Sequence, residues 1–172
     1  MLKEYKVALI FVGKFLLVYV VANFVYGIFV ESFDLVDPIT LFVTDQSTLP
    51  ISWIYDGVEV SVNSERPTAF LTLNEATVIS VFEGCNGVNV GIIFLSFIFA
   101  YRSPVKSSII FSLIGLLIIH VANLLRITGL FWVADARPEY LYFIHKYVFT
   151  GVIYFVVFLM WILWVRMNKI SN

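Results

Sequence analysis

Residues 108–133 read SIIFSLIGLLIIHVANLLRITGLFWV, and Arg126 is the only charged residue in this stretch. A helix needs about 20 predominantly apolar residues to cross the hydrocarbon core of a bilayer. The stretch exceeds that length, so it predicts a transmembrane helix that carries one guanidinium inside the membrane.

Three more apolar blocks lie outside this stretch, at residues 7–30, 84–101 and 147–165. The block at 84–101 is the shortest, and it spans a membrane only if its helix begins near residues 83–87. The whole chain is 60% hydrophobic and 13% charged, proportions that exclude an ordinary soluble domain. We therefore expect an all-α polytopic membrane protein with about four transmembrane helices, in a single membrane domain over residues 1–172.

Basic residues are confined almost entirely to one side of these blocks, and Lys and Arg favour cytoplasmic loops. That side includes a single acid, Glu4, and these cations: Lys3, Lys6, Lys14, Arg102, Lys106, Arg166 and Lys169. The opposite side carries all of the other Asp and Glu residues, together with Arg66, Arg137 and Lys146. The asymmetry predicts that both termini and the loop at 102–107 are cytoplasmic and that residues 31–81 form an extracytoplasmic insertion.

The insertion contains signals for helix breaks and for strands. Asp37-Pro38 and Leu49-Pro50 predict irregular or short helical structure in its first half. Residues 58–62 alternate valine with polar residues, a period of two that predicts a half-buried strand. A second run at residues 68–73 follows a turn-like segment, so we expect a small extracytoplasmic β-hairpin. That hairpin forms either one wall of a substrate groove or a lid over the helices.

The chain has one cysteine, Cys85, and two histidines. A single cysteine cannot form an internal disulfide, and this set is too small for an ordinary structural zinc site. We therefore expect no metal and no cofactor. A lone cysteine in an apolar protein usually packs without a chemical role, so its position must support any other interpretation.

The predicted topology brings Cys85, Arg126 and His145 to the same side of the membrane. Cys85 lies at the outer end of the second predicted helix, and His145 lies at the outer start of the fourth. Arg126 lies roughly 9 Å below Trp132, where the third helix leaves the membrane. All three side chains can therefore meet just beneath the outer surface, and we expect them to form a catalytic cluster.

Each of the three residues also has a simpler explanation. An arginine at the bilayer centre costs at least ~2.5 kcal/mol and usually faces the interior of a helix bundle, although its side chain could also snorkel to the headgroups. The positive end of the following helix favours a thiolate at Cys85, whereas the alternative is inert packing. His145 stands near a membrane surface, where histidine commonly has no chemical duty.

The neighbours of these residues add further candidates. Asn86 and Gly87 leave the thiol sterically open, and Asn123 lies one turn from Arg126 on nearly the same face, where it can orient the guanidinium. We expect these three to bind or orient the substrate. The competing histidine, His120, lies two turns deeper than Arg126 on another side of the helix. Its position favours packing or a hydrogen bond between helices.

These residue types together support nucleophilic acyl transfer. A thiolate attacks a peptide carbonyl, a histidine gives a proton to the departing amine, and an arginine stabilises the oxyanion. The product is a thioacyl-enzyme. An amine that resolves it makes the protein a transpeptidase, whereas water makes it a protease, and the residues do not decide between them.

At these residues the chain resembles the exosortase and archaeosortase family of integral membrane proteins. Residues 83–88 (EGCNGV) are similar to the family's motif around its cysteine, with Asn86 where serine is more usual. Residues 123–127 (NLLRI) are similar to its arginine motif, and His145 followed by Gly151 is similar to its looser histidine motif. The resemblance covers about half of the chain, and the short length is similar to the small form of the family called XrtF.

The resemblance implies an exosortase-like cysteine peptidase or transpeptidase with Cys85, Arg126 and His145 as catalytic residues. It implies a place in the bacterial cytoplasmic (inner) membrane, with the active site at the extracytoplasmic face. The implied substrates are exported proteins with a C-terminal sorting signal, made of a short motif, a transmembrane helix and a basic tail. The released product goes to a cell-surface acceptor. Larger members carry additional helices, so a small membrane partner protein is a further expectation, whereas nucleic acid is not.

Two other functions compete with this interpretation. A non-catalytic membrane scaffold or assembly factor for surface-protein export would use Cys85 for packing and Arg126 as an ion-pair partner of Glu83. A small transporter or channel could use the buried arginine to line an anion path. The sequence has no internal repeat and no acidic residue inside the membrane to accompany Arg126, which disfavours the transporter.

Overall fold

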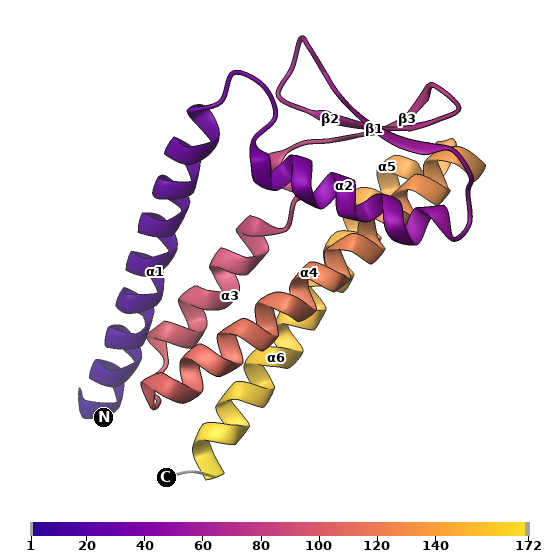
Figure 1. The fold of residues 1–172 in the computed structure, drawn as a ribbon. Coiled ribbons are helices and arrows are strands. Elements are labelled where there is room, and N and C mark those ends of the chain that lie inside the picture. Colours follow the sequence, from indigo (N-terminus) through magenta and orange to yellow (C-terminus); the bar gives the residue numbers. More distant parts are fainter. Residues whose placement is uncertain (1, 171–172) are drawn as a thin grey trace.

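The computed structural model describes residues 2–170, which form a bundle of helices with a small sheet at one end (Figure 1). The helices that run along the bundle are α1 (Leu2–Glu31), α3 (Val88–Ala100), α4 (Val105–Ala136) and α6 (Thr150–Ile170). The short elements between α4 and α6 are η2 (Pro138–Tyr140), α5 (Leu141–Phe143) and the π-helical segment η3 (Ile144–Phe149). Lys3, Glu4 and Lys169, which contribute to the charge asymmetry, lie outside the residues whose side chains are described.

The predicted helical membrane fold is confirmed. Among the described residues, three stretches are long and apolar enough to cross a membrane: Tyr5–Glu31, Val105–Ala136 and Pro138–Asn168. The fourth apolar helix, α3, has 13 residues and rises about 20 Å, less than the ~30 Å of a hydrocarbon core. It begins at Val88, after the expected start, because Gly87 adopts a left-handed conformation with a φ of 85°.

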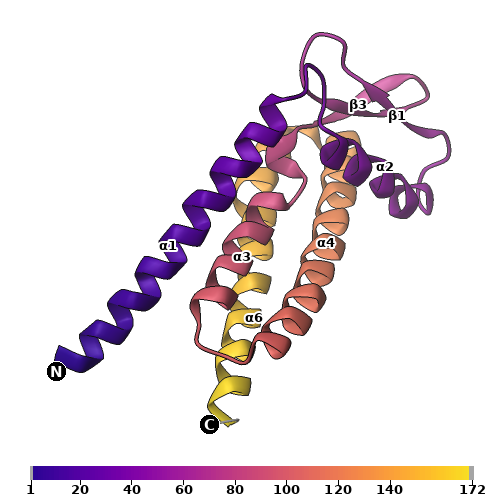
Figure 2. The same ribbon diagram turned by 60° about the vertical axis from the view of Figure 1, so that its left-hand side comes forward.

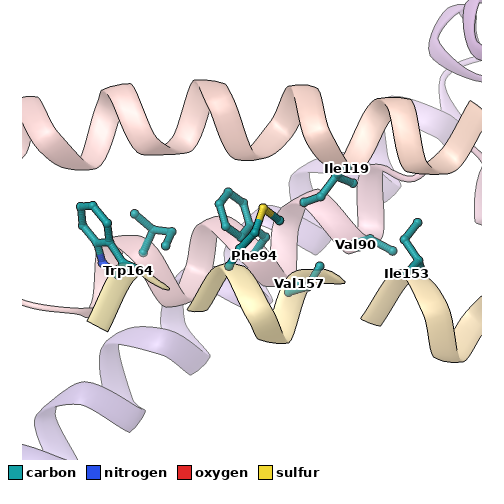
Figure 3. Close-up of a cluster of buried hydrophobic side chains, with 8 residues drawn as sticks. Val90, Phe94, Ile119, Ile153, Val157 and Trp164 are labelled. Atoms are coloured by element: carbon teal, nitrogen blue, oxygen red, sulfur yellow. The ribbon is translucent and has the colours of Figure 1, made fainter. Parts of the chain in front are cut away.

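The bundle packs around apolar side chains from α3, α4 and α6 (Figure 3). The buried members of this cluster are Val90, Phe94, Ile98, Ile119, Ile153, Val157, Met160 and Trp164. Gly115 of α4 allows a close approach of α3, because a Cβ atom there would overlap the phenyl ring of Phe94. Helix α1 lies beside α3 and diverges from the bundle toward its N-terminal end (Figure 2). Its apolar surface is therefore left for lipid.

Helix α2 (Pro38–Ser52) lies across the end of the bundle that carries the sheet (Figure 1). The carboxylate of Asp37 accepts two N–H groups of its first turn at 3.0 Å, and Pro38 occupies a position where no N–H is needed. The break predicted at Asp37-Pro38 is the start of this helix, whereas the break predicted at Leu49-Pro50 is wrong, since the helix continues to Ser52. Pro50 lies in the last turn, where the loss of one N–H interrupts little of the helix.

The rest of the insertion forms a three-stranded antiparallel sheet in the order β1-β2-β3. Its strands are β1 (Val58–Val62), β2 (Ala69–Leu73) and β3 (Ala76–Val81). The first two confirm the predicted hairpin, whereas the sequence analysis missed the third. Asn74 and Glu75 join β2 to β3 with φ values of 50° and 70°, as in the two-residue turns that favour hairpins.

A second apolar cluster attaches the sheet to α2 and α4. Its buried members are Val43, Ile51, Leu71, Val81, Cys85, Ile127 and Phe131. The cysteine is therefore part of the contact between the sheet and the bundle, and the sheet is not a detached lid.

Candidate active site

Cys85 lies in a tight turn between the sheet and the bundle. The 3-10 helix η1 (Glu83–Cys85) joins β3 to α3, and the Cys85 N–H donates to the Phe82 carbonyl over 2.8 Å. The left-handed conformation of Gly87 favours glycine, and a Cβ atom there would also lie 3.2 Å from Asn123 Cγ. The turn therefore brings η1 close to α4, and Cys85 is only 6% exposed.

Asn86 anchors this turn to two other helices. Its amide nitrogen donates to the Tyr26 hydroxyl over 2.6 Å and to Thr40 Oγ1 over 2.8 Å, and its Oδ1 accepts the Val88 N–H over 2.9 Å. Both amide hydrogens are thus engaged within the protein, and the side chain is buried. These bonds favour an anchoring role for Asn86 over the predicted contact with substrate.

Helix α4 supplies Asn123 and Arg126 from one face. Asn123 Nδ2 donates to the Cys85 carbonyl over 2.9 Å, and its Oδ1 accepts from Arg126 Nη1 over 3.4 Å. Both residues are buried. The asparagine therefore connects the backbone of the cysteine to the guanidinium, which is the orienting position expected for it.

His145 completes the cluster from the segment before α6. Its Nε2 lies 3.1 Å from Arg126 Nη2 and 3.9 Å from Cys85 Sγ. The structure thus brings together all three side chains that the topology predicts to meet. The distance to sulfur is long for a hydrogen bond, so this contact is the weaker of the two.

A π-helical turn presents His145 to α4. Thr150 Oγ1 donates to the His145 carbonyl over 3.0 Å and so satisfies an acceptor at the point where η3 meets α6. Gly129 of α4 makes room for this segment, because a Cβ atom there would lie 2.5 Å from the ring of Phe149. Single π turns inside α-helices occur frequently at functional sites.

The contact with Arg126 determines the protonation of His145. An arginine side chain can only donate hydrogen bonds, so Nε2 of the histidine is the acceptor. The imidazole is then neutral with its proton on Nδ1, an assignment made from the hydrogen-bond pattern. Because Nε2 has one lone pair, it serves either Arg126 or the Cys85 thiol, but not both at once.

Burial dominates the ionisation of Cys85, which lies in η1 outside the membrane-spanning stretches. Burial raises the pKa of its thiol, and this effect exceeds the opposing effects of the Arg126 charge and of the hydrogen bond with the Phe82 backbone. The expected preference for a thiolate at the positive end of α3 does not dominate, since Cys85 precedes that helix by three residues. At neutral pH the Cys85 thiol is therefore neutral and lies beside a neutral imidazole.

A cavity of about 210 Å³ adjoins the thiol and the imidazole. Its lining comes from β3, η1, α4, α5 and η3: Val78, Ile79, Ser80, Val81, Cys85, Ile127, Leu130, Leu141 and His145. Arg126 contacts the lining residue His145 but does not itself line the cavity, and its Nε atom is buried without a hydrogen-bond partner among the described residues. An unpartnered donor is available to a negative oxygen, which is what stabilises an oxyanion.

The other histidine, His120, has a separate environment. Its Nε2 lies 2.6 Å from Gln46 Oε1 of α2, and its ring stacks on Phe42. It therefore links α2 to α4, in agreement with the hydrogen bond between helices that its position favours.

Four supporting residues escape the sequence analysis: Tyr26, Thr40, Gly129 and Thr150. Each of them acts through a contact with a residue of the site or its π turn, and none belongs to a local motif. Only Thr150, which lies five residues after the histidine, offers a signal in the sequence, because that spacing suits a π turn.

The chain matches a family of membrane proteins over most of its length. The family model Exosortase_EpsH, described as transmembrane exosortase, matches residues 4–164, a range that includes Cys85, Arg126 and His145. No match was found among curated proteins or among solved structures. The chain belongs to the transmembrane exosortase family.

Proposed function

We propose that this chain is a membrane-embedded cysteine transpeptidase or protease that removes C-terminal sorting signals through a thioacyl intermediate. The observation that carries the proposal is the convergence on one atom: His145 Nε2 lies 3.1 Å from the guanidinium of Arg126 and 3.9 Å from the sulfur of Cys85. Membership in the exosortase family supports it independently of this geometry.

The first step is attack on a substrate carbonyl in the cavity beside Cys85. Nε2 of His145 takes the thiol proton, and the sulfur forms a bond to the carbonyl carbon while the π electrons move to oxygen. Arg126 stabilises that oxygen, and its unpartnered Nε–H is one donor for it. Asn123 orients the guanidinium through its Oδ1.

The second step is collapse of the tetrahedral intermediate. The carbon–nitrogen bond breaks, and the protonated His145 returns the proton to the departing amine. The amine belongs to the C-terminal part of the substrate, and the thioacyl group stays on Cys85. Attack by the amine of a cell-surface acceptor completes transpeptidation, and attack by water completes hydrolysis.

The proposed setting follows the charge asymmetry of the sequence. Both termini are cytoplasmic, and the cluster faces the extracytoplasmic side of the bacterial cytoplasmic membrane. Substrates are exported proteins that end in a short motif, a transmembrane helix and a basic tail. A small membrane partner protein supplies contacts that larger exosortases make with their additional helices.

A comparison of cells that produce the unchanged protein or Cys85→Ala tests the proposal. We expect Cys85→Ala to reach the same level in the membrane while exported precursors that keep their basic C-terminal tail accumulate. Ser96→Ala is the matched control, because Ser96 is a buried small side chain of α3 that bonds only within its own helix. Mass spectrometry of C-terminal peptides in the membrane and secreted fractions measures the precursors.

The scaffold alternative predicts the opposite result, with normal precursor levels in Cys85→Ala cells. It also relies on an ion pair between Arg126 and Glu83. Both residues are described, and they form no ion pair. The guanidinium instead contacts Asn123 and His145.

A further inference from the structure

An open strand edge borders the proposed nucleophile. β3 is an outer strand, since the sheet has the order β1-β2-β3. Its residues 78–81 line the cavity that also contains Cys85 and His145. The outer edge of a sheet carries N–H and C=O groups that can pair with another extended chain.

Two backbone hydrogen bonds show which residues of β2 direct their main-chain N–H and C=O groups toward β1. Asn63 N–H donates to the Thr68 carbonyl over 3.0 Å, and Asn74 N–H donates to the Gly57 carbonyl over 3.4 Å. Hydrogen-bonded pairs alternate with non-bonded pairs along an antiparallel ladder. The main-chain groups of even-numbered β2 residues therefore face β1, and those of odd-numbered residues such as Leu71 face β3.

This alternation leaves the main chain of Ser80 on the open edge. Ile79 and Val81 lie opposite Leu71 and Ala69, so their N–H and C=O groups turn toward β2. Ser80 lies between them and directs its N–H and C=O away from the sheet. Its side chain is exposed, and no backbone group elsewhere in the described chain bonds to it.

Building on the proposed function, we infer that the substrate segment before the scissile bond docks as a fourth strand along β3 and pairs with the main chain of Ser80. An extended peptide is the partner that matches such an edge, because its own N–H and C=O groups recur at strand spacing. β3 leads into η1, which contains Cys85. β3 runs toward Cys85 and is followed by the apolar helix α3. In the substrate, the docking segment likewise runs toward the scissile bond and is followed by a membrane helix, so the segment runs parallel to β3.

The cavity also determines which side chains this strand carries. Val78 and Ile79 are half-buried in its wall, and Leu130 and Leu141 complete the apolar surface. Side chains alternate between the two faces of a strand, so every second residue of the substrate meets this surface. The docking segment therefore carries apolar residues at alternate positions, whereas the main chain supplies most of the affinity.

Alkylation of Cys85 tests the docking without requiring proteolysis. The full chain in detergent micelles is treated with iodoacetamide, with acetyl-alanine chloromethyl ketone and with acetyl-Val-Thr-Val-Ala chloromethyl ketone. We expect the tetrapeptide to react faster than the single-residue reagent. Ser80→Pro removes the N–H on the open edge and should reduce that advantage about fivefold, the effect of one hydrogen bond.

Two variants serve as controls for Ser80→Pro. Ser80→Ala keeps the N–H and should retain the advantage. Val62→Pro places the same ring at an outward-facing position of β1, the opposite edge, and should also retain it. Iodoacetamide should alkylate Cys85 at the same rate in every protein, which shows that the turn around the thiol is intact.

If Ser80→Pro changes the iodoacetamide rate, the unchanged protein is tested with tetrapeptides methylated at single backbone nitrogens. Loss of the advantage at alternate nitrogens then supports the docking. Equal rates for the two chloromethyl ketones, or an advantage that survives both Ser80→Pro and every methylation, would overturn it. Normal precursor levels in Cys85→Ala cells would contradict the proposed function instead, whatever these rates are.

Discussion

Arg126 Nη2 donates a hydrogen bond to His145 Nε2 over 3.1 Å, on the same nitrogen that faces the sulfur of Cys85 at 3.9 Å. The guanidinium thus engages the lone pair of His145 Nε2 while no substrate is bound. In the proposed mechanism the guanidinium shifts toward the substrate carbonyl oxygen, and this shift frees Nε2 to take the thiol proton as the sulfur attacks. Oxyanion stabilisation and activation of the base are then one movement.

We expect Arg126→Lys to lower the processing rate about 100-fold, although it keeps the positive charge. Lysine has one nitrogen and no planar fork, so it cannot contact Asn123, His145 and a substrate oxygen together. Processing of a precursor in isolated membranes, normalised to the amount of enzyme, measures the effect. Arg102→Lys, in the connection between α3 and α4, is the matched control. An unchanged rate in Arg126→Lys would show that charge alone suffices.

The raised pKa of Cys85 predicts slow alkylation at neutral pH. Below its raised pKa the thiol has a smaller thiolate fraction than a free cysteine, and the thiolate is the reactive form. Iodoacetamide should therefore react more slowly with Cys85 in the native protein than in the denatured chain. The rate should still be rising with pH at pH 9.0, which is the ordinary pKa of a thiol. Arg126→Gln should slow the reaction further, because the Arg126 charge lowers the pKa. Faster labelling of the native protein would contradict the effect of burial.

Gly129→Ala should displace the segment that carries His145. A Cβ atom at this position meets the ring of Phe149 at 2.5 Å, and overpacking of this kind costs about 1–3 kcal/mol. We expect a lower unfolding temperature in detergent and a loss of processing. Gly151→Ala is the control, since a Cβ atom there has no neighbour within 4 Å. Addition of Phe149→Leu should restore part of the activity of Gly129→Ala, and no such rescue is expected if Gly129 matters for another reason.

The two histidines should differ in their effect on catalysis. His145→Ala should abolish processing with little change in stability, because the contacts of its ring are with Cys85 and Arg126 of the proposed catalytic cluster. His120→Ala should lower the unfolding temperature, since it removes the bond to Gln46 that joins α4 to α2, but should retain processing. Precursor processing and thermal unfolding of both variants provide the comparison. Loss of processing in a fully folded His120→Ala protein would show that His120 also has a role in catalysis.

The parts of the fold that the sequence predicts are those that depend on local patterns. Apolar blocks predict the helices, because hydrocarbon excludes charge and demands internal hydrogen bonding. The alternation at 58–62 predicts β1, because successive side chains of a strand point to opposite faces of the sheet. The meeting of Cys85, Arg126 and His145 follows from counting crossings, since the alternating direction of the helices brings all three residues to the same end of the bundle.

The remaining features depend on contacts between distant segments. Pro50 suggests a break, yet α2 continues through it because the helix is packed on α4 and capped at Asp37. The sequence predicts that Asn86, next to Cys85, binds or orients the substrate, but in the structure its amide donates to Tyr26 and Thr40. Neither outcome is visible from the spacing of residues along the chain.

The π turn makes the site respond differently to the loss and to the gain of a residue. A π turn closes over one more residue than a turn of α-helix. Deletion of a single codon between His145 and Thr150 would let the backbone regain 3.6 residues per turn, and the histidine would then lie four residues before the threonine, with its imidazole in nearly the same direction. Insertion of one codon at the same place would rotate the preceding segment about 100° relative to α6, and the intact imidazole would be aimed elsewhere.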